Sequence, residues 1–282
     1  MTSTVPDTDT FARAWADWHA AKEAGLAAPH GFLSVVSLTW LDAEPRQAPG
    51  APGSWAVTDR GVVVALAEGE QLAVDGTPVT GEHVFGELGL RESVTADSGD
   101  VVVELAERGG RYVVRTRDPR SPLRAAHPGT PAYPADPRWA LTGRFEAFPE
   151  VRPTAVDGAF AGVRHVYDAP GVVHVEVDGQ QIALTAFPGH GAGRLAVLFS
   201  DATSGTDTYA FRSLQLDPPD ADGTVVVDFN RAVNLPCAYT DLATCPTPPA
   251  ENRLAFAVEA GEQTPLARGV GRPTEHGAVL DA

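Results

Sequence analysis

Most of the sequence beyond residue 30 alternates apolar and polar residues with a period of two, and turn residues interrupt this pattern at short intervals. Such alternation is typical of half-buried antiparallel strands. The clearest hairpin is "VVVELAERGGRYVVRTRD", in which two β-branched runs flank Gly109-Gly110, and a second one turns at Asp178-Gly179. Many short strands separated by turns predict a mainly β fold, an antiparallel β-sandwich or barrel, with two β-lobes as an option.

One helix is expected before these strands, over residues 7–26. Asp7 or Thr8 can cap its start, and Phe11, Trp15 and Trp18 recur at helical spacing. Gly25 and Pro29 provide the signals that end the helix. We expect the two tryptophans to pack on a sheet.

The proline-rich stretch over residues 118–137 is the best internal boundary. The expected organisation is an N-terminal helix, a first β-lobe, a second β-lobe and a polar tail that frays, over residues 1–30, 31–117, 118–262 and 263–282.

The formal net charge of −16 disfavours nucleic acid as a partner, because an acidic surface repels phosphate backbones. No apolar run is long enough to span a membrane, and the N-terminal residues lack the pattern of a signal peptide. A cytoplasmic protein with reduced cysteines is therefore expected. Lys22 is the only lysine and falls on the predicted surface helix, which argues against Schiff-base chemistry.

Arginines gather around the proline-rich stretch. Strand periodicity places Arg115 and Arg117 on the same face of one strand, where two guanidiniums can bind a carboxylate or phosphate. The alternative is a structural network in which these arginines pair with Asp118, Asp136 or Glu146.

The segment "FSDATSGTDTYAFR", residues 199–212, reads as a tight turn between two strands. Small hydroxyl residues such as Thr203 and Ser204 bond to their own backbone in such turns. The functional interpretation is a polar rim where Asp201 or Tyr209 meets a ligand.

Both cysteines lie in the irregular segment that follows the strand "VVVDFN". Cys237 and Cys245 are eight positions apart, which is not a zinc-ribbon or thioredoxin-like spacing. A disulfide between them is feasible because the loop is short. A nucleophilic cysteine is a second alternative, although the spacing assigns no histidine to it. The plainest interpretation is two small buried side chains.

The histidines form no H-E-x-x-H motif, although His165 and His174 could face each other across a hairpin as a metal pair. The glycine-rich "PGHGAGR" lacks the spacing of a dinucleotide or P-loop motif, and no G-x-S-x-G elbow occurs. We therefore expect no cofactor and assign no metal ligands.

Four stretches resemble the motifs of a bacterial and archaeal group of uncharacterised proteins, domain of unknown function family 1684. They are "HGFLSVVSLTWLDAE", "VVRTRDPRSPLRAAHPGTPAYPADPRW", "LFSDATSGTDTYAFR" and "VDFNRAVNLPCAYTDLATCPTPPAENRLAFAVEAGE". The resemblance extends over about residues 11–262 and implies no established activity. The chain differs from the family pattern at Ala125-Ala126-His127 and at Asn234-Leu235-Pro236-Cys237, which leaves a shared ligand specificity open.

The leading hypothesis is a small-molecule enzyme of hydrolase type, or a binding protein, that takes an anionic ligand. The alternatives are a structural or partner-interaction β module without catalysis, and a metal-dependent enzyme with His and Cys ligands. The candidate catalytic residues are Asp201, Asp228 and Cys237, and the candidate ligand-binding residues are Arg115, Arg117, Thr203, Ser204, Tyr209, Asn230, Asn252 and Arg253.

Overall fold

The computed structural model describes residues 8–281, and these residues form an N-terminal helix followed by several antiparallel sheets. The predicted mainly β fold is confirmed, and no sheet among the described residues closes into a barrel. The chain divides into two compact units. Among the described residues, unit 1 comprises residues 8–23, 129–238 and 245–266, and unit 2 comprises residues 24–128, 239–244 and 267–281.

Helix α1 (Thr8–Leu26) confirms the predicted helix, while Asp7, one of the two expected caps, lies outside the described residues. Within unit 1 its tryptophans contact the segment that follows a strand. Trp15 Nε1 donates a hydrogen bond to the Asn230 carbonyl at 2.6 Å, and the Arg231 guanidinium lies 5.3 Å from the Trp18 ring centroid.

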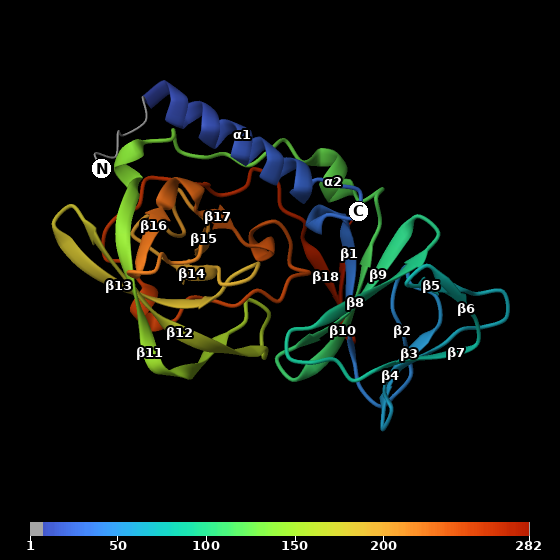
Figure 1. Cartoon of the computed structure of the whole chain (residues 1–282). Coiled ribbons are helices and arrows are strands. Elements are labelled where there is room, and N and C mark those ends of the chain that lie inside the picture. Colours follow the sequence, from blue (N-terminus) through green and yellow to red (C-terminus); the bar gives the residue numbers. More distant parts are fainter. Residues whose placement is uncertain (1–7, 282) are drawn as a thin grey trace. The chain divides into compact units, whose positions relative to one another are not determined.

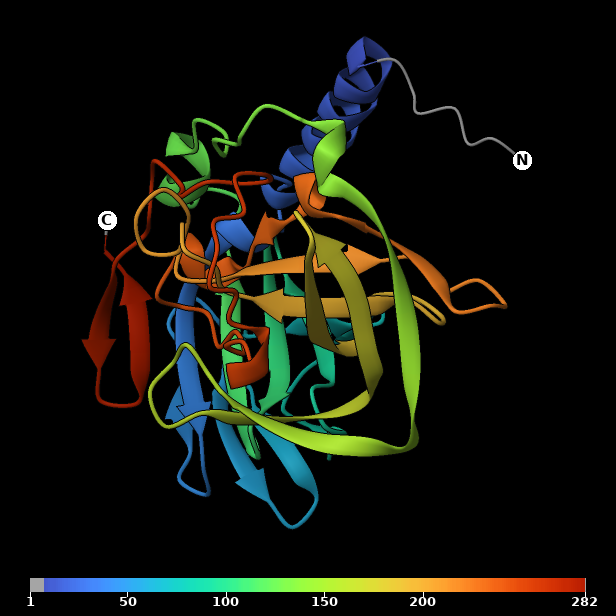
Figure 2. The same ribbon diagram turned by 90° about the vertical axis from the view of Figure 1, so that its left-hand side faces the viewer.

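Unit 1 is built on one antiparallel sheet (Figure 1). Its strands are β11 (Ala140–Asp157), β12 (Arg164–Val177), β13 (Gln180–Pro188), β14 (Leu195–Phe199), β15 (Arg212–Leu216), β16 (Thr224–Asp228) and β17 (Val233–Asn234). They pair in the order β16-β11-β12-β13-β14-β15-β17. Strand β11 bends where its register with β12 shifts between Ala147 and Arg152, as Figure 2 shows in yellow-green. Residues of these strands, among them Phe199 and Leu214, bury an apolar core together with Phe229 of the turn after β16.

Unit 2 holds two further antiparallel sheets. Its strands are β1 (Val35–Leu41), β2 (Arg46–Gln47), β3 (Ser54–Thr58), β4 (Gly61–Ala65), β5 (Leu72–Val74), β6 (Thr77–Val79), β7 (Glu82–Gly86), β8 (Ser93–Ser98), β9 (Val101–Arg108), β10 (Arg111–Arg117), β18 (Gly271–Thr274) and β19 (Gly277–Leu280). The larger sheet has the order β18-β19-β1-β10-β9-β8-β5-β6, and the smaller one has the order β2-β3-β4-β7.

The two predicted hairpins are confirmed. Strands β9 and β10 meet at Gly109-Gly110, and both glycines have positive φ angles, which a type I′ hairpin turn requires. Strands β12 and β13 meet at Asp178-Gly179 in the same way.

Two expectations were wrong. Residues 271–280, expected to fray, form β18 and β19, and β19 pairs with β1 from Ser37 to Thr39, so its backbone groups complete a sheet edge. His165 and His174 both lie on the single long strand β12, and therefore do not face each other across a hairpin.

Short helical turns connect the strands. They are α2 (Pro122–Ala126) and the 3₁₀ turns η1 (Phe32–Ser34), η2 (Pro137–Trp139), η3 (Phe229–Arg231), η4 (Pro236–Ala238) and η5 (Ala250–Asn252). Among residues 8–281, no helix combines the length and apolarity needed to cross a lipid bilayer.

Candidate functional site

The first polar site lies in unit 2, on one face of the β9–β10 hairpin. Arg115 is the direct cross-strand partner of Glu104, so the two side chains project from the same face of the sheet. Arg117 follows two positions later on that face, as its spacing predicted, and Arg108 is four positions after Glu104 on β9. We call Glu104, Arg108, Arg115 and Arg117 the arginine cluster.

The carboxylate of Glu104 is almost completely buried and is shared among these arginines. Arg115 Nη2 lies 2.7 Å from Oε1, Arg117 Nη2 lies 2.6 Å from Oε2, and Arg108 Nη2 lies 3.5 Å from Oε1. Burial by itself would raise the pKa of Glu104, but the charges of Arg115 and Arg117 outweigh it, so the pKa is lowered below its usual value. The predicted alternative partners of Arg115 and Arg117 were Asp118, Asp136 and Glu146; the observed partner is Glu104.

The arginine cluster holds more positive than negative charge. Three guanidiniums share one carboxylate, and the Nε atom of Arg115 is buried without a hydrogen-bond partner among the described residues. Arg117 has 19% of its side chain exposed, which is enough to reach solvent. The guanidiniums of Arg115 and Arg117 also lie within 5.7 Å of the Phe32 ring centroid. Three guanidiniums around one carboxylate give this face the chemistry to attract an anion.

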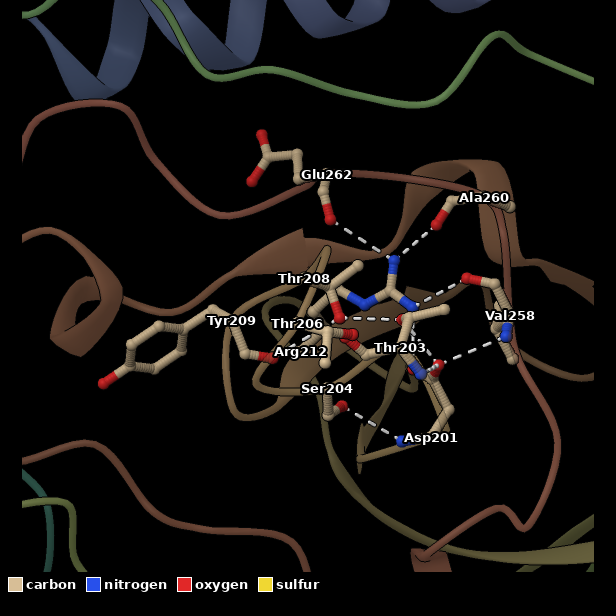
Figure 3. A network of polar contacts seen from close by, with 10 residues as sticks. All are labelled: Asp201, Thr203, Ser204, Thr206, Thr208, Tyr209, Arg212, Val258, Ala260 and Glu262. Carbon is tan, nitrogen blue, oxygen red and sulfur yellow. Dashed lines mark hydrogen bonds and ion pairs between the residues drawn. The ribbon is translucent and has the colours of Figure 1, made fainter.

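The second polar site lies in unit 1, at the turn between β14 and β15. Arg212, the first residue of β15, pairs with Asp201 at 2.8 Å, and neither side chain has any exposed surface. Asp201 Oδ1 also accepts hydrogen bonds from the backbone amide and hydroxyl of Thr203, at 2.8 and 2.6 Å, and from the amide of Val258. We call this arrangement, drawn in Figure 3, the turn network.

Arg212 extends the turn network to a distant segment of the chain. Its guanidinium donates to the backbone carbonyls of Val258, Ala260 and Glu262, as Figure 3 shows. The backbone amide of Asp201 donates a hydrogen bond to the Ser204 hydroxyl, as expected of a turn residue. Both carboxylate oxygens of Asp201 therefore accept hydrogen bonds and have no exposed surface, which does not suit general-base chemistry. Arg212 is the last residue of the predicted turn segment 199–212, but no role was predicted for it from the sequence.

The remaining predicted residues of unit 1 also bond within the fold. Asp228 Oδ1 accepts from the amide and side chain of Asn230, and Asn230 exchanges two hydrogen bonds with the backbone of Asp136. Asn252 is fully buried and hydrogen-bonds to both backbone groups of Thr185. Arg253, by contrast, is exposed.

A third polar site joins helix α1 to the loop at Glu262, within unit 1. Lys22 Nζ lies 2.6 Å from Glu262 Oε1 and 3.1 Å from Glu23 Oε1, and His19 Nε2 lies 3.1 Å from Glu262 Oε1. Atoms of His19, Glu23 and Glu262 could ligate a metal and lie within 4.8 Å of one another. The ammonium of Lys22 already provides a cation to both carboxylates. These residues were not predicted, although His19 and Glu23 have the i, i+4 spacing of one helix face.

The structure divides the predicted residues between the two units. Arg115 and Arg117 belong to unit 2, whereas the other candidates belong to unit 1. Within unit 1 the turn network unites Asp201, Thr203 and Ser204, while the Tyr209 ring points away from Arg212 in Figure 3.

The comparisons with known proteins identify a family but no activity. The model of the family described as "Protein of unknown function (DUF1684)" matches residues 125–263, which confirms the predicted resemblance for that range. No curated protein matches the chain. A solution NMR structure of an uncharacterized protein from Haloarcula marismortui is similar, with 29% sequence identity, over 51% of this chain and 80% of that protein, at a TM-score of 0.43.

Proposed function

We propose that this chain, which belongs through residues 125–263 to the DUF1684 family, binds a small anionic ligand at the arginine cluster of unit 2. The observation that carries the proposal is the charge imbalance, because three guanidiniums share the single carboxylate of Glu104. The cluster lies outside the matched range, so the proposal concerns this chain and not the whole family. A cytoplasmic location remains a prediction from the sequence.

The ligand chemistry follows from the guanidinium. Arg117 uses Nε and Nη2 on Glu104 and Nη1 on the His30 carbonyl, and Arg115 uses Nη2 on Glu104. The donors that remain are planar N–H groups, which suit the oxygens of a carboxylate or a phosphate. A small anion would add negative charge beside a cluster that lacks it, without separating Glu104 from its arginines.

The hydrolytic reaction expected from the sequence has weaker support than binding. Asp201 is enclosed by its donors, and the pKa of the Cys237 thiol is raised by its hydrogen bond to Cys245 and by burial. A protonated thiol is a poor nucleophile. We therefore propose binding, and we assign no catalytic step to these residues.

A panel of anions tests the proposal. Thermal unfolding would be followed with sodium phosphate, sulfate, acetate and citrate, each at an ionic strength matched with sodium chloride. A ligand that binds only the native state at a hundredfold excess over its Kd stabilises it by about 2.7 kcal/mol. We expect at least one anion to raise the Tm of the wild type and of Arg120→Ala, but not that of Arg117→Ala.

Arg120 is the matched control, because its side chain is exposed and pairs with the neighbouring Asp118. An equal response of Arg117→Ala and the wild type would overturn the proposal. So would the lack of any response of the wild type beyond that to sodium chloride.

A structural role without a ligand is the second candidate, and Asn252 favours it. Its amide group joins Thr185 to Leu198 through three hydrogen bonds, at 2.8 to 2.9 Å, in a fully buried environment. Such a residue stabilises a loop whether or not the protein binds anything.

A further inference from the structure

The two cysteines of the chain are in contact within unit 1. Cys237 lies in η4 and Cys245 in the loop that follows, and both are buried, with 3% and 8% exposure. The backbone N–H of Cys237 donates a hydrogen bond to Cys245 Sγ at 3.3 Å. The sequence spacing alone had left a disulfide, a metal site, a nucleophilic cysteine and inert burial as alternatives.

The two thiols are not equivalent. The hydrogen bond to Cys245, burial and the charge of Cys245 all raise the pKa of Cys237, and the hydrogen bond from Tyr209 opposes them. The backbone amide of Cys237 donates to Cys245 Sγ, so the sulfur of Cys245 has a donor that stabilises its thiolate. Cys245 is also the more exposed of the two, so we assign the first attack on an oxidant to it.

The position of the pair in the chain gives a bond between them a defined effect. Residues 239–244 between the cysteines belong to unit 2, whereas Cys237 and Cys245 themselves belong to unit 1. A covalent bond would tie together the two points at which the chain leaves unit 1 and returns to it. The bond would also restrict the unfolded chain, since it closes a loop.

We propose that Cys237 and Cys245 form a reversible disulfide by exchange with a low-molecular-weight disulfide such as oxidised glutathione. The Cys245 thiolate attacks one sulfur of the oxidant, forms a mixed disulfide and releases one glutathione thiolate. Cys237 then gives up its proton, attacks Cys245 Sγ and releases the second glutathione thiolate. In total the protein loses two hydrogen atoms, and one oxidised glutathione becomes two reduced ones.

Intact-mass spectrometry of the full chain tests this order. The reduced wild type would be incubated with oxidised glutathione, and remaining thiols would be alkylated with iodoacetamide after quenching in acid and denaturation. We expect the wild type to lose two hydrogen atoms and to take up neither alkyl groups nor glutathione. It should also unfold at a higher Tm than its reduced form.

Single variants separate the two roles. Cys237→Ser lacks the resolving thiol, so it should hold one glutathione on Cys245. Cys245→Ser should remain reduced several-fold longer, because the remaining Cys237 is the less exposed thiol and carries no charge in the proposed scheme. The proposal would be overturned if oxidised glutathione left both thiols of the native wild type open to alkylation while it oxidised the urea-unfolded chain. Equal glutathione uptake by the two variants would overturn the assigned order of attack.

Discussion

The arginine cluster and the turn network use the same two chemical groups with different stoichiometry. In the turn network one guanidinium meets one carboxylate, both without exposed surface, and three backbone carbonyls accept most of the remaining donors. In the arginine cluster three guanidiniums share Glu104, and Arg117 remains partly exposed. A balanced, closed pair stabilises a fold, whereas an unbalanced and partly open one leaves charge available for a ligand.

The largest effect is expected where the balanced pair is broken. Asp201→Ala leaves the Arg212 guanidinium buried without its counter-charge, so unfolding free energy should fall by about 3–5 kcal/mol. Urea unfolding monitored by tryptophan fluorescence would measure the change. Asp217→Ala is the matched control, because it removes an exposed partner of Arg194 and should cost less than about 1 kcal/mol. If the two variants were equally stable, the turn network would not be the structural pair described above.

A smaller loss is expected at Asn252. Asn252→Ala leaves backbone groups of Thr185 and Leu198 buried without their partners, which should cost about 3 kcal/mol. The neighbouring Arg253→Ala, which alters an exposed side chain, should stay within about 0.5 kcal/mol of the wild type. Equilibrium unfolding of both variants would decide this. A stable Asn252→Ala protein with unchanged anion binding would contradict the structural role of this loop.

The arginine cluster should make the stability of the protein depend on pH. The pKa of Glu104 is lower in the folded chain than its ordinary value, so its ionised form stabilises the fold at pH values above that ordinary value. This contribution is lost as the pH falls through the folded pKa. The stability difference between the wild type and Glu104→Gln should therefore be constant near neutral pH and shrink progressively in acid. A difference that grows as the pH falls would reverse the assigned sign.

The smallest effect on stability is expected at Arg117. Its removal ends an attraction to Glu104, but it also removes repulsion from Arg108 and Arg115, so Arg117→Ala should cost about 1 kcal/mol or less. Chemical unfolding in parallel with Arg120→Ala would measure it. A loss as large as that of Asp201→Ala would mean that the cluster is a structural ion pair like the turn network.

The residue types of the candidate sites were readable from the sequence, but their partners were not. The placement of Arg115 and Arg117 on one strand face followed from the period of two. The turn at Gly109-Gly110 places Arg115 opposite Glu104, but the period of two does not show that Arg108 and Arg117 converge on the same buried carboxylate. Asp201 was recognised as a turn residue, yet its partner Arg212 was overlooked within the same motif.

The sequence by itself determined the mainly β fold, the N-terminal helix and the two glycine-containing hairpins, because side-chain periodicity and turn chemistry are local properties. Only the tertiary structure decided which charges are balanced. It brought Glu262 to His19 and Lys22 across more than two hundred residues, and Arg212 to the carbonyls of residues 258–262. Such contacts depend on the packing of segments that are far apart in the chain. The pattern of neighbouring residues therefore does not determine how exposed a charged side chain is or which opposite charge it meets.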